Sequence, residues 1–113
     1  MCPRSSLRTR IDNELALGRE AAAVGNAGRA RVCARRAAGW AIQAWYQRQE
    51  GMGWAGDALN QLQRLQSDAA VPPPVRQAAE RLSTKVGVDH RLPFDDDALE
   101  DARKIIEYVA DTA

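Results

Sequence analysis

The chain has 113 residues, a length that accommodates one domain and excludes a two-domain enzyme. Its 16 Lys and Arg residues nearly balance 15 Asp and Glu residues, so any contact with nucleic acid must be a patch rather than a polycationic surface. Hydrophobic residues make up 45% and charged residues 27% of the sequence, which is typical of a folded globular domain and excludes a disordered chain.

Helical spacing of apolar residues, interrupted by glycine- and proline-rich segments, predicts five helices. They span about residues 6–24, 27–50, 54–69, 74–86 and 96–111. No segment alternates with period two for long enough to predict a strand. The expected fold class is therefore all-α, an up-and-down bundle of four to five antiparallel helices with a central, Ala-rich second helix. We expect residues 1–6 to form a flexible tail and residues 7–113 a single domain.

The first two helices are expected to form an antiparallel hairpin. An apolar stripe at spacings of three or four marks the buried face of the first: Leu7, Ile11, Leu15, Gly18 and Ala22. Gly25 suits the left-handed position that closes this helix, and the side chain of Asn26 can cap the next one. A turn this short brings the second helix back along the first.

The second helix carries a line of alanines that allows a neighbouring backbone to approach closely: Ala30, Ala34, Ala37, Ala41 and Ala44. Cys33 and Trp40 flank this line on one side, and Ala38, Ile42 and Trp45 on the other, so the predicted buried arc is wide and the helix central. A second stripe, Val32, Gly39 and Tyr46, lies on the opposite face. It could receive another helix or a second subunit, and we interpret it as a candidate homodimer interface.

Arg29, Arg31, Arg35 and Arg36 are candidate binding residues, because clustered guanidinium groups can hold a phosphate, a nucleotide or an RNA backbone. They project from two flanks of the helix, however, and do not converge. Acidic residues such as Glu14, Glu20 or Asp101 could neutralise them. We therefore favour structural or interfacial roles for these arginines, and core positions for Trp40, Trp45 and Trp54.

The C-terminal half shows capping signals but no metal motif. Pro74 fits the first turn of the fourth helix. Asp95, Asp96 and Asp97 open the fifth, where they complement the helix dipole better than they would gather around a cation. Cys2 and Cys33 lack the partners of a zinc site. We expect no metal and no cofactor.

Neither a membrane segment nor a secretory signal is expected. The N-terminal arginines are followed by Ile11, Asp12, Asn13 and Glu14 rather than by an apolar stretch. The most apolar window, residues 37–46, is about half as long as a spanning helix. These features predict a cytoplasmic protein with both thiols reduced, Cys33 as a small core residue and Cys2 in the tail.

The order of the helices, and especially residues 25–40 (GNAGRARVCARRAAGW), resembles the HEPN superfamily of small bacterial helical bundles. The resemblance covers about residues 7–111. It implies an up-and-down bundle that often dimerises. It also implies membership in a group linked with nucleotide binding, with toxin and antitoxin pairs whose partner is a nucleotidyltransferase-type protein, and with metal-independent RNA cleavage.

The catalytic HEPN pattern places an arginine four to six residues before a polar residue and a histidine. In this chain the single histidine, His90, is preceded at that distance by Lys85, and Arg81 lies too far upstream. Lysine lacks the planar fork of a guanidinium group. We therefore expect no catalytic residues and a self-associating binding or regulatory module. The alternatives are a ribonuclease that uses His90, Lys85 and Arg81, and an RNA- or nucleotide-binding protein.

Overall fold

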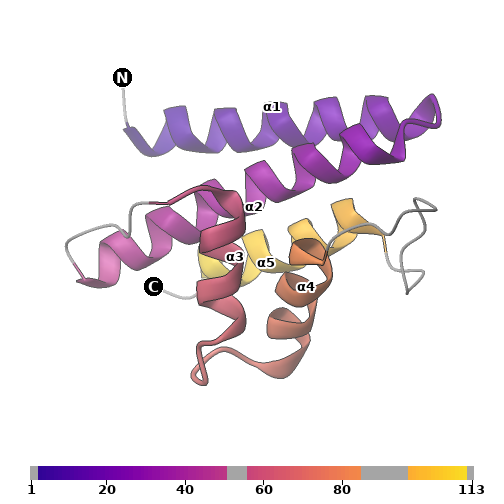
Figure 1. The fold of residues 1–113 in the computed structure, drawn as a ribbon. Coiled ribbons are helices and arrows are strands. Elements are labelled where there is room, and N and C mark those ends of the chain that lie inside the picture. Colours follow the sequence, from indigo (N-terminus) through magenta and orange to yellow (C-terminus); the bar gives the residue numbers. More distant parts are fainter. Residues whose placement is uncertain (1–2, 51–55, 85–96, 112–113) are drawn as a thin grey trace.

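A computed structural model describes residues 3–50, 56–84 and 97–111, with only the backbone of residues 3–6 and 50. Helices occupy nearly all of these residues, and no strand occurs among them. They are α1 (Pro3–Ala23), α2 (Ala27–Glu50), α3 (Ala58–Gln66), α4 (Pro73–Ser83) and α5 (Ala98–Asp111) (Figure 1). The predicted all-α helical bundle is confirmed. None of the helices in these ranges combines the length and the apolar character needed to span a bilayer.

The helix bounds differ from the predicted ones at α1 and α3. α1 begins at Pro3 rather than at the predicted residue 6. α3 is shorter than the predicted 54–69, because the Asp57 carboxylate accepts the Asn60 N–H at 3.0 Å and caps the helix there. The ends predicted at residues 54, 86 and 96 lie outside the described residues.

The α1–α2 turn follows the predicted capping pattern. Gly25 has φ 81°, the left-handed conformation that a glycine adopts without strain. The N–H groups of Gly25 and Asn26 donate to the carbonyls of Ala22 and Ala21 at 3.0 and 2.8 Å, which satisfies the end of α1. The Asn26 side chain accepts the Arg29 N–H at 3.1 Å and caps α2. Both predicted caps are confirmed.

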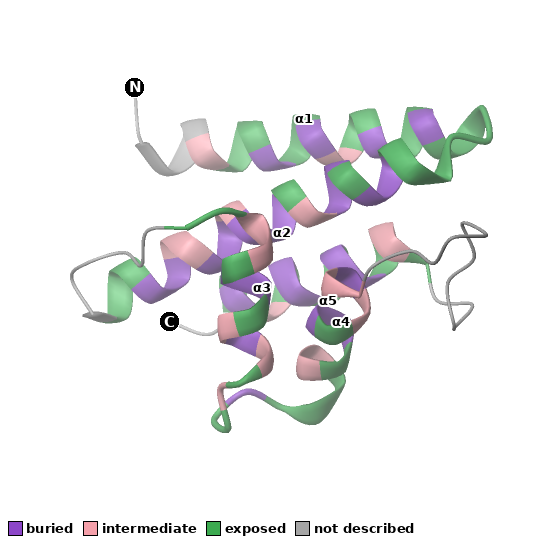
Figure 2. Ribbon diagram, in the orientation of Figure 1, coloured by how far each residue is buried: buried purple, intermediate pink, exposed green. Residues whose placement is uncertain are grey.

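α2 is the central helix and packs against each of the other four described helices. Most of the predicted buried arc is enclosed (Figure 2): Ala30, Cys33, Ala34, Ala37, Ala38, Ala41, Ile42 and Trp45. Trp40 and Ala44 are half-buried. The line of alanines therefore lies in the core and brings neighbouring helices close to the α2 backbone.

α1 and α5 both lie along α2. α1 runs antiparallel to α2, whereas α5 runs in the same direction as α2 (Figure 1). Leu99 of α5 packs against Gly18, where a methyl group would lie 2.7 Å from Leu99 Cδ2 and 3.1 Å from Cys33 Cβ. At the other end of α5, Arg48 Nη2 donates to the Val109 carbonyl at 3.3 Å. α1 thus packs mainly on α2 and meets α5 around Gly18.

Candidate functional site

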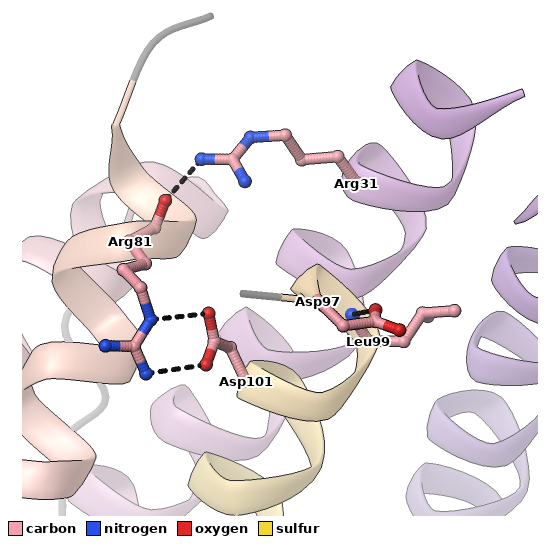
Figure 3. A network of polar contacts seen from close by, with 5 residues as sticks. All are labelled: Arg31, Arg81, Asp97, Leu99 and Asp101. Atoms are coloured by element: carbon pink, nitrogen blue, oxygen red, sulfur yellow. Dashed lines mark hydrogen bonds and ion pairs between the residues drawn. The ribbon is translucent and has the colours of Figure 1, made fainter. Parts of the chain in front are cut away.

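Two of the predicted binding arginines, Arg31 and Arg35, point into the bundle and cap the C-terminal end of α4. Arg31 Nη2 donates to the Arg81 carbonyl (Figure 3) and, at 2.7 Å, to the Thr84 carbonyl. Arg35 donates through Nε to the Leu82 carbonyl at 2.5 Å and through Nη2 to the Thr84 carbonyl at 2.9 Å. The Arg81 and Leu82 carbonyls lie in the last turn of α4, and Thr84 is its C-cap, whose N–H also donates to the Arg81 carbonyl at 3.3 Å. The two cations also face the negative end of the α4 dipole.

Burial changes the ionisation of both groups. Desolvation is the main cause that lowers the pKa of Arg31 and of Arg35 from the ordinary value of an arginine. The nearby charge of Arg35 lowers the pKa of Arg31 further, whereas the carboxylate of Asp101 opposes the shift. Arg31 is only 5% exposed, so its charge is held by carbonyl oxygens rather than by water.

Arg81, a residue of the alternative catalytic set, forms a buried ion pair with Asp101 of α5. Its Nε and Nη2 atoms donate to Oδ2 and Oδ1 at 3.0 and 2.8 Å (Figure 3). Asp101 is 2% exposed, and both of its oxygens are used. The bidentate geometry fixes α4 against α5. His90 and Lys85, the other two residues of that set, lie outside the described residues.

The remaining two arginines lie on the surface. Arg36 Nη1 forms an ion pair with Glu14 Oε2 of α1 at 3.2 Å, so one of the three acidic residues predicted as neutralising partners does pair with the cluster. Asp101 pairs instead with Arg81. Arg29 is exposed in the first turn of α2. Arg31 and Arg35 share the end of α4, Arg36 pairs with α1 and Arg29 is exposed, so the four arginines do not form one cradle.

The stripe predicted as an interface is divided by the chain's own α3. At Gly39 a methyl group would lie 2.8 Å from Ala58 Cα, so α3 packs directly on this position. The Tyr46 hydroxyl donates to Asp68 Oδ2 at 2.7 Å, and the Arg64 guanidinium lies 3.8 Å from the centre of the Tyr46 ring. Of these stripe residues, Val32 is the one that stays open to solvent, at 47% exposure.

No group of three or more His, Cys, Asp or Glu residues within the described ranges could hold a metal ion. Of the acidic triplet, Asp95 and Asp96 lie outside these ranges. Asp97 accepts the Leu99 N–H at 2.8 Å and caps α5. Cys33 is buried between α1 and α2, and burial together with a hydrogen bond to Glu14 raises the pKa of its thiol.

A groove lies between α2 and α3 and is called here the α2–α3 groove. Its volume is about 530 Å³. The lining residues are Val32, Arg35, Arg36, Gly39, Trp40, Gln43, Gly56, Asp57, Ala58, Leu59 and Gln61. The groove combines an apolar strip around Val32 and Trp40 with charges of both signs, Arg36 and Asp57.

A second groove lies over α2 between α1 and α5 and is called here the α1–α5 groove. Its volume is about 370 Å³. The lining residues are Leu7, Arg8, Ile11, Ala41, Ala44, Arg48, Ile106, Val109 and Ala110. Its walls and floor are apolar, and the charged side chains among these residues are both arginines.

Sequence reasoning missed both grooves and the roles of Asp68 and Asp101. Ala41 and Ala44 belong to the predicted line of alanines. Their small side chains form the floor of the α1–α5 groove, so part of this groove had a signal in the sequence. Asp101 stands beside the apolar positions of its helix, a spacing that signals a buried carboxylate in need of a cation. Comparisons of the chain with protein-family profiles, curated proteins and solved structures found no match.

Proposed function

We propose that this chain is a non-catalytic helical binding module of the HEPN-like type, and that it self-associates. The inward orientation of Arg31 and Arg35 carries the proposal. Their guanidinium groups are engaged by α4 carbonyls, so they are not available to a phosphate backbone. That leaves Arg29 and Arg36 on the surface, where Arg36 pairs with Glu14 through Nη1. The arginine-rich sequence of α2 is thus better explained by stabilisation of the bundle than by nucleic-acid binding.

The α2–α3 groove supports self-association. A two-fold symmetric contact places the same patch on both copies, so the patch must be complementary to itself. Arg36 and Asp57 lie at different points of this groove, and a two-fold axis can bring the cation of one copy to the carboxylate of the other. Val32, 47% exposed, supplies apolar surface in the groove. Trp40 extends that surface along α2.

The experiment is sedimentation velocity over a range of protein concentrations. The native chain is expected to shift from monomer to dimer by tens of micromolar, a concentration range that corresponds to a moderate interface. Val32→Glu replaces an exposed apolar side chain of the groove with a carboxylate and is expected to raise the dissociation constant at least about tenfold. Val24→Glu is the matched control, because Val24 is 81% exposed and lies outside the groove.

A native chain that stays monomeric over this range would contradict self-association, as would equal effects of the two substitutions. RNA binding that weakens steeply with added salt would contradict the assignment as a protein-binding module, because such a dependence reports phosphate contacts.

A further inference from the structure

The α1–α5 groove is an apolar channel formed where two helices diverge over a third. α1 and α5 meet around Gly18 and Leu99, and Figure 1 shows α1 and α2 moving apart toward the N-terminal end of α1. The groove lies at this wider end, between Ile11 on one wall and Val109 on the other. It is separate from the α2–α3 groove, and its lining shares no residue with it.

The floor of this groove is made by alanines of α2. Ala41 is buried and Ala44 is half-buried beneath the walls. Methyl side chains at successive turns keep the floor close to the α2 backbone, so an incoming helix can approach at the short end of the usual 8–10 Å interaxial distance. A channel with α1 and α5 as its walls, α2 as its floor and its remaining side open to solvent has the shape that receives an amphipathic helix.

The charge of the groove limits what it can receive. Arg8 and Arg48 are its charged lining residues, and both are positive. Arg8 forms only a loose pair with Asp12 at 3.4 Å, with both side chains more than half exposed. Arg48 donates one hydrogen bond to the Val109 carbonyl and is otherwise exposed. Both guanidinium groups therefore retain donors that a carboxylate can accept.

These charges argue against a second copy docked groove to groove. A two-fold contact through this groove would bring the Arg8 and Arg48 side chains of both copies together, and like charges facing each other oppose association. The α2–α3 groove lacks this conflict because it contains both signs. The occupant of the α1–α5 groove must instead bring negative charge beside an apolar face.

We propose that the α1–α5 groove binds an amphipathic helix of a partner protein, with the partner's apolar face on Ala41 and Ala44 and acidic residues beside Arg8 and Arg48. This inference goes beyond the proposed self-association and uses a different surface. The lining residues of α2 run from Ala41 to Arg48, about 10 Å along the helix axis, so about two turns of a partner helix cover the groove and place carboxylates near both arginines.

The test uses synthetic peptides of about 18 residues with leucines at positions i, i+3, i+4 and i+7 of each repeat. One peptide carries glutamates beside the leucine stripe, the second carries lysines at the same positions, and the third is a scrambled version of the first. Fluorescence anisotropy with the full chain is expected to show binding of the glutamate peptide at least about tenfold tighter than binding of the other two. Equal affinities, or no binding of the glutamate peptide up to about 1 mM, would overturn the proposal.

Three variants place the peptide on the chain. Arg8→Glu is expected to weaken binding of the glutamate peptide at least about tenfold, whereas Arg19→Glu, an exposed position of α1 outside the groove, leaves it unchanged. Ala44→Leu raises the floor and is expected to weaken binding without loss of the thermal midpoint, because Ala44 is only half-buried. Thermal unfolding followed by circular dichroism separates lost binding from lost folding.

The same titrations distinguish this inference from self-association. Val32→Glu is expected to bind the glutamate peptide with the same affinity as the native chain. A chain that is monomeric would therefore contradict self-association but not peptide binding in the α1–α5 groove. Decanoate, a fatty acid anion with an apolar chain and one carboxylate, serves as a competitor. If decanoate displaces the glutamate peptide and binds more tightly than the peptide, the groove is a site for acyl carboxylates and the proposal fails. Loss of peptide binding in Arg19→Glu equal to that in Arg8→Glu would also contradict it.

Discussion

Arg81 and Asp101 form a bidentate ion pair between α4 and α5, with Nε–Oδ2 and Nη2–Oδ1 distances of 3.0 and 2.8 Å. The carbonyl of the same Arg81 accepts a hydrogen bond from Arg31. One residue therefore links α4 to α2 through its backbone and to α5 through its side chain (Figure 3). Arg81, one of the three residues of the alternative catalytic set, therefore joins three helices.

Asp101→Ala is expected to destabilise the chain by about 3 kcal/mol, because it leaves the largely buried Arg81 guanidinium without its carboxylate. Urea unfolding followed by circular dichroism measures the change. Glu100→Ala is the control, since Glu100 pairs with Arg103 on the surface and its loss is expected to have a much smaller effect. Similar unfolding midpoints for the two variants would show that the buried pair is not important for stability.

Arg35→Ala removes two hydrogen bonds from the last turn of α4, to the carbonyls of Leu82 and Thr84. Hydrogen bonds from a charged donor contribute about 1.5–3 kcal/mol each, so a loss of at least about 1.5 kcal/mol in the free energy of unfolding is expected. Arg29→Ala, on the exposed first turn of the same helix, is expected to leave this free energy unchanged. If Arg35→Ala instead weakens RNA binding and leaves stability intact, the capping role is wrong.

Gly39→Ala and Gly28→Ala are expected to change stability in opposite directions. A methyl at Gly39 would lie 2.8 Å from Ala58 Cα, which forces α3 away from α2. A methyl at Gly28 meets only Asn26 Oδ1 at 4.0 Å, so the higher helix propensity of alanine is expected to add up to about 1 kcal/mol. Thermal unfolding of the two variants decides the point. A stabilised Gly39→Ala would contradict the close packing of α2 and α3.

Cys33 is expected to make stability fall at alkaline pH. Its thiol has a raised pKa in the folded chain because of burial, so above the ordinary thiol pKa of about 8.5 the unfolded chain loses its proton first and is favoured. Below that pH both states hold the proton and Cys33 contributes no slope. The free energy of unfolding of the native chain should therefore fall more steeply between about pH 8 and pH 10 than that of Cys33→Ala. Parallel curves for the two chains would rule out the shift.

The fold was largely predictable from the sequence because local signals and the apolar periodicity agreed. The alanine line identified α2 as central, and Gly25 and Asn26 marked the turn before it. The bounds of α3 were less accessible. They depend on which of several polar residues acts as a cap, and Asp57 takes that role.

The site was less predictable, because the partner of each arginine lies far away in the sequence. Helical geometry separated Arg31 and Arg35 from Arg29 and Arg36, but it did not identify the α4 carbonyls that receive the first pair. The stripe through Gly39 had the composition of an interface, and whether its partner is another chain or α3 depends on the tertiary packing. Grooves are formed by the divergence of whole helices, which no local pattern encodes.

The attachment of α1 through one face has a consequence for motion. Among its described side chains, Ile11 and Ala21 are the hydrophobic ones that are fully enclosed, whereas α2 contributes many more. Breaking this one contact surface exposes less apolar area than global unfolding does, so α1 is expected to detach in excursions that leave the other helices assembled. Amide protons of α1 should then exchange with deuterated solvent earlier than those of the middle of α2, and the earlier exchange would mark α1 as a separable cooperative unit.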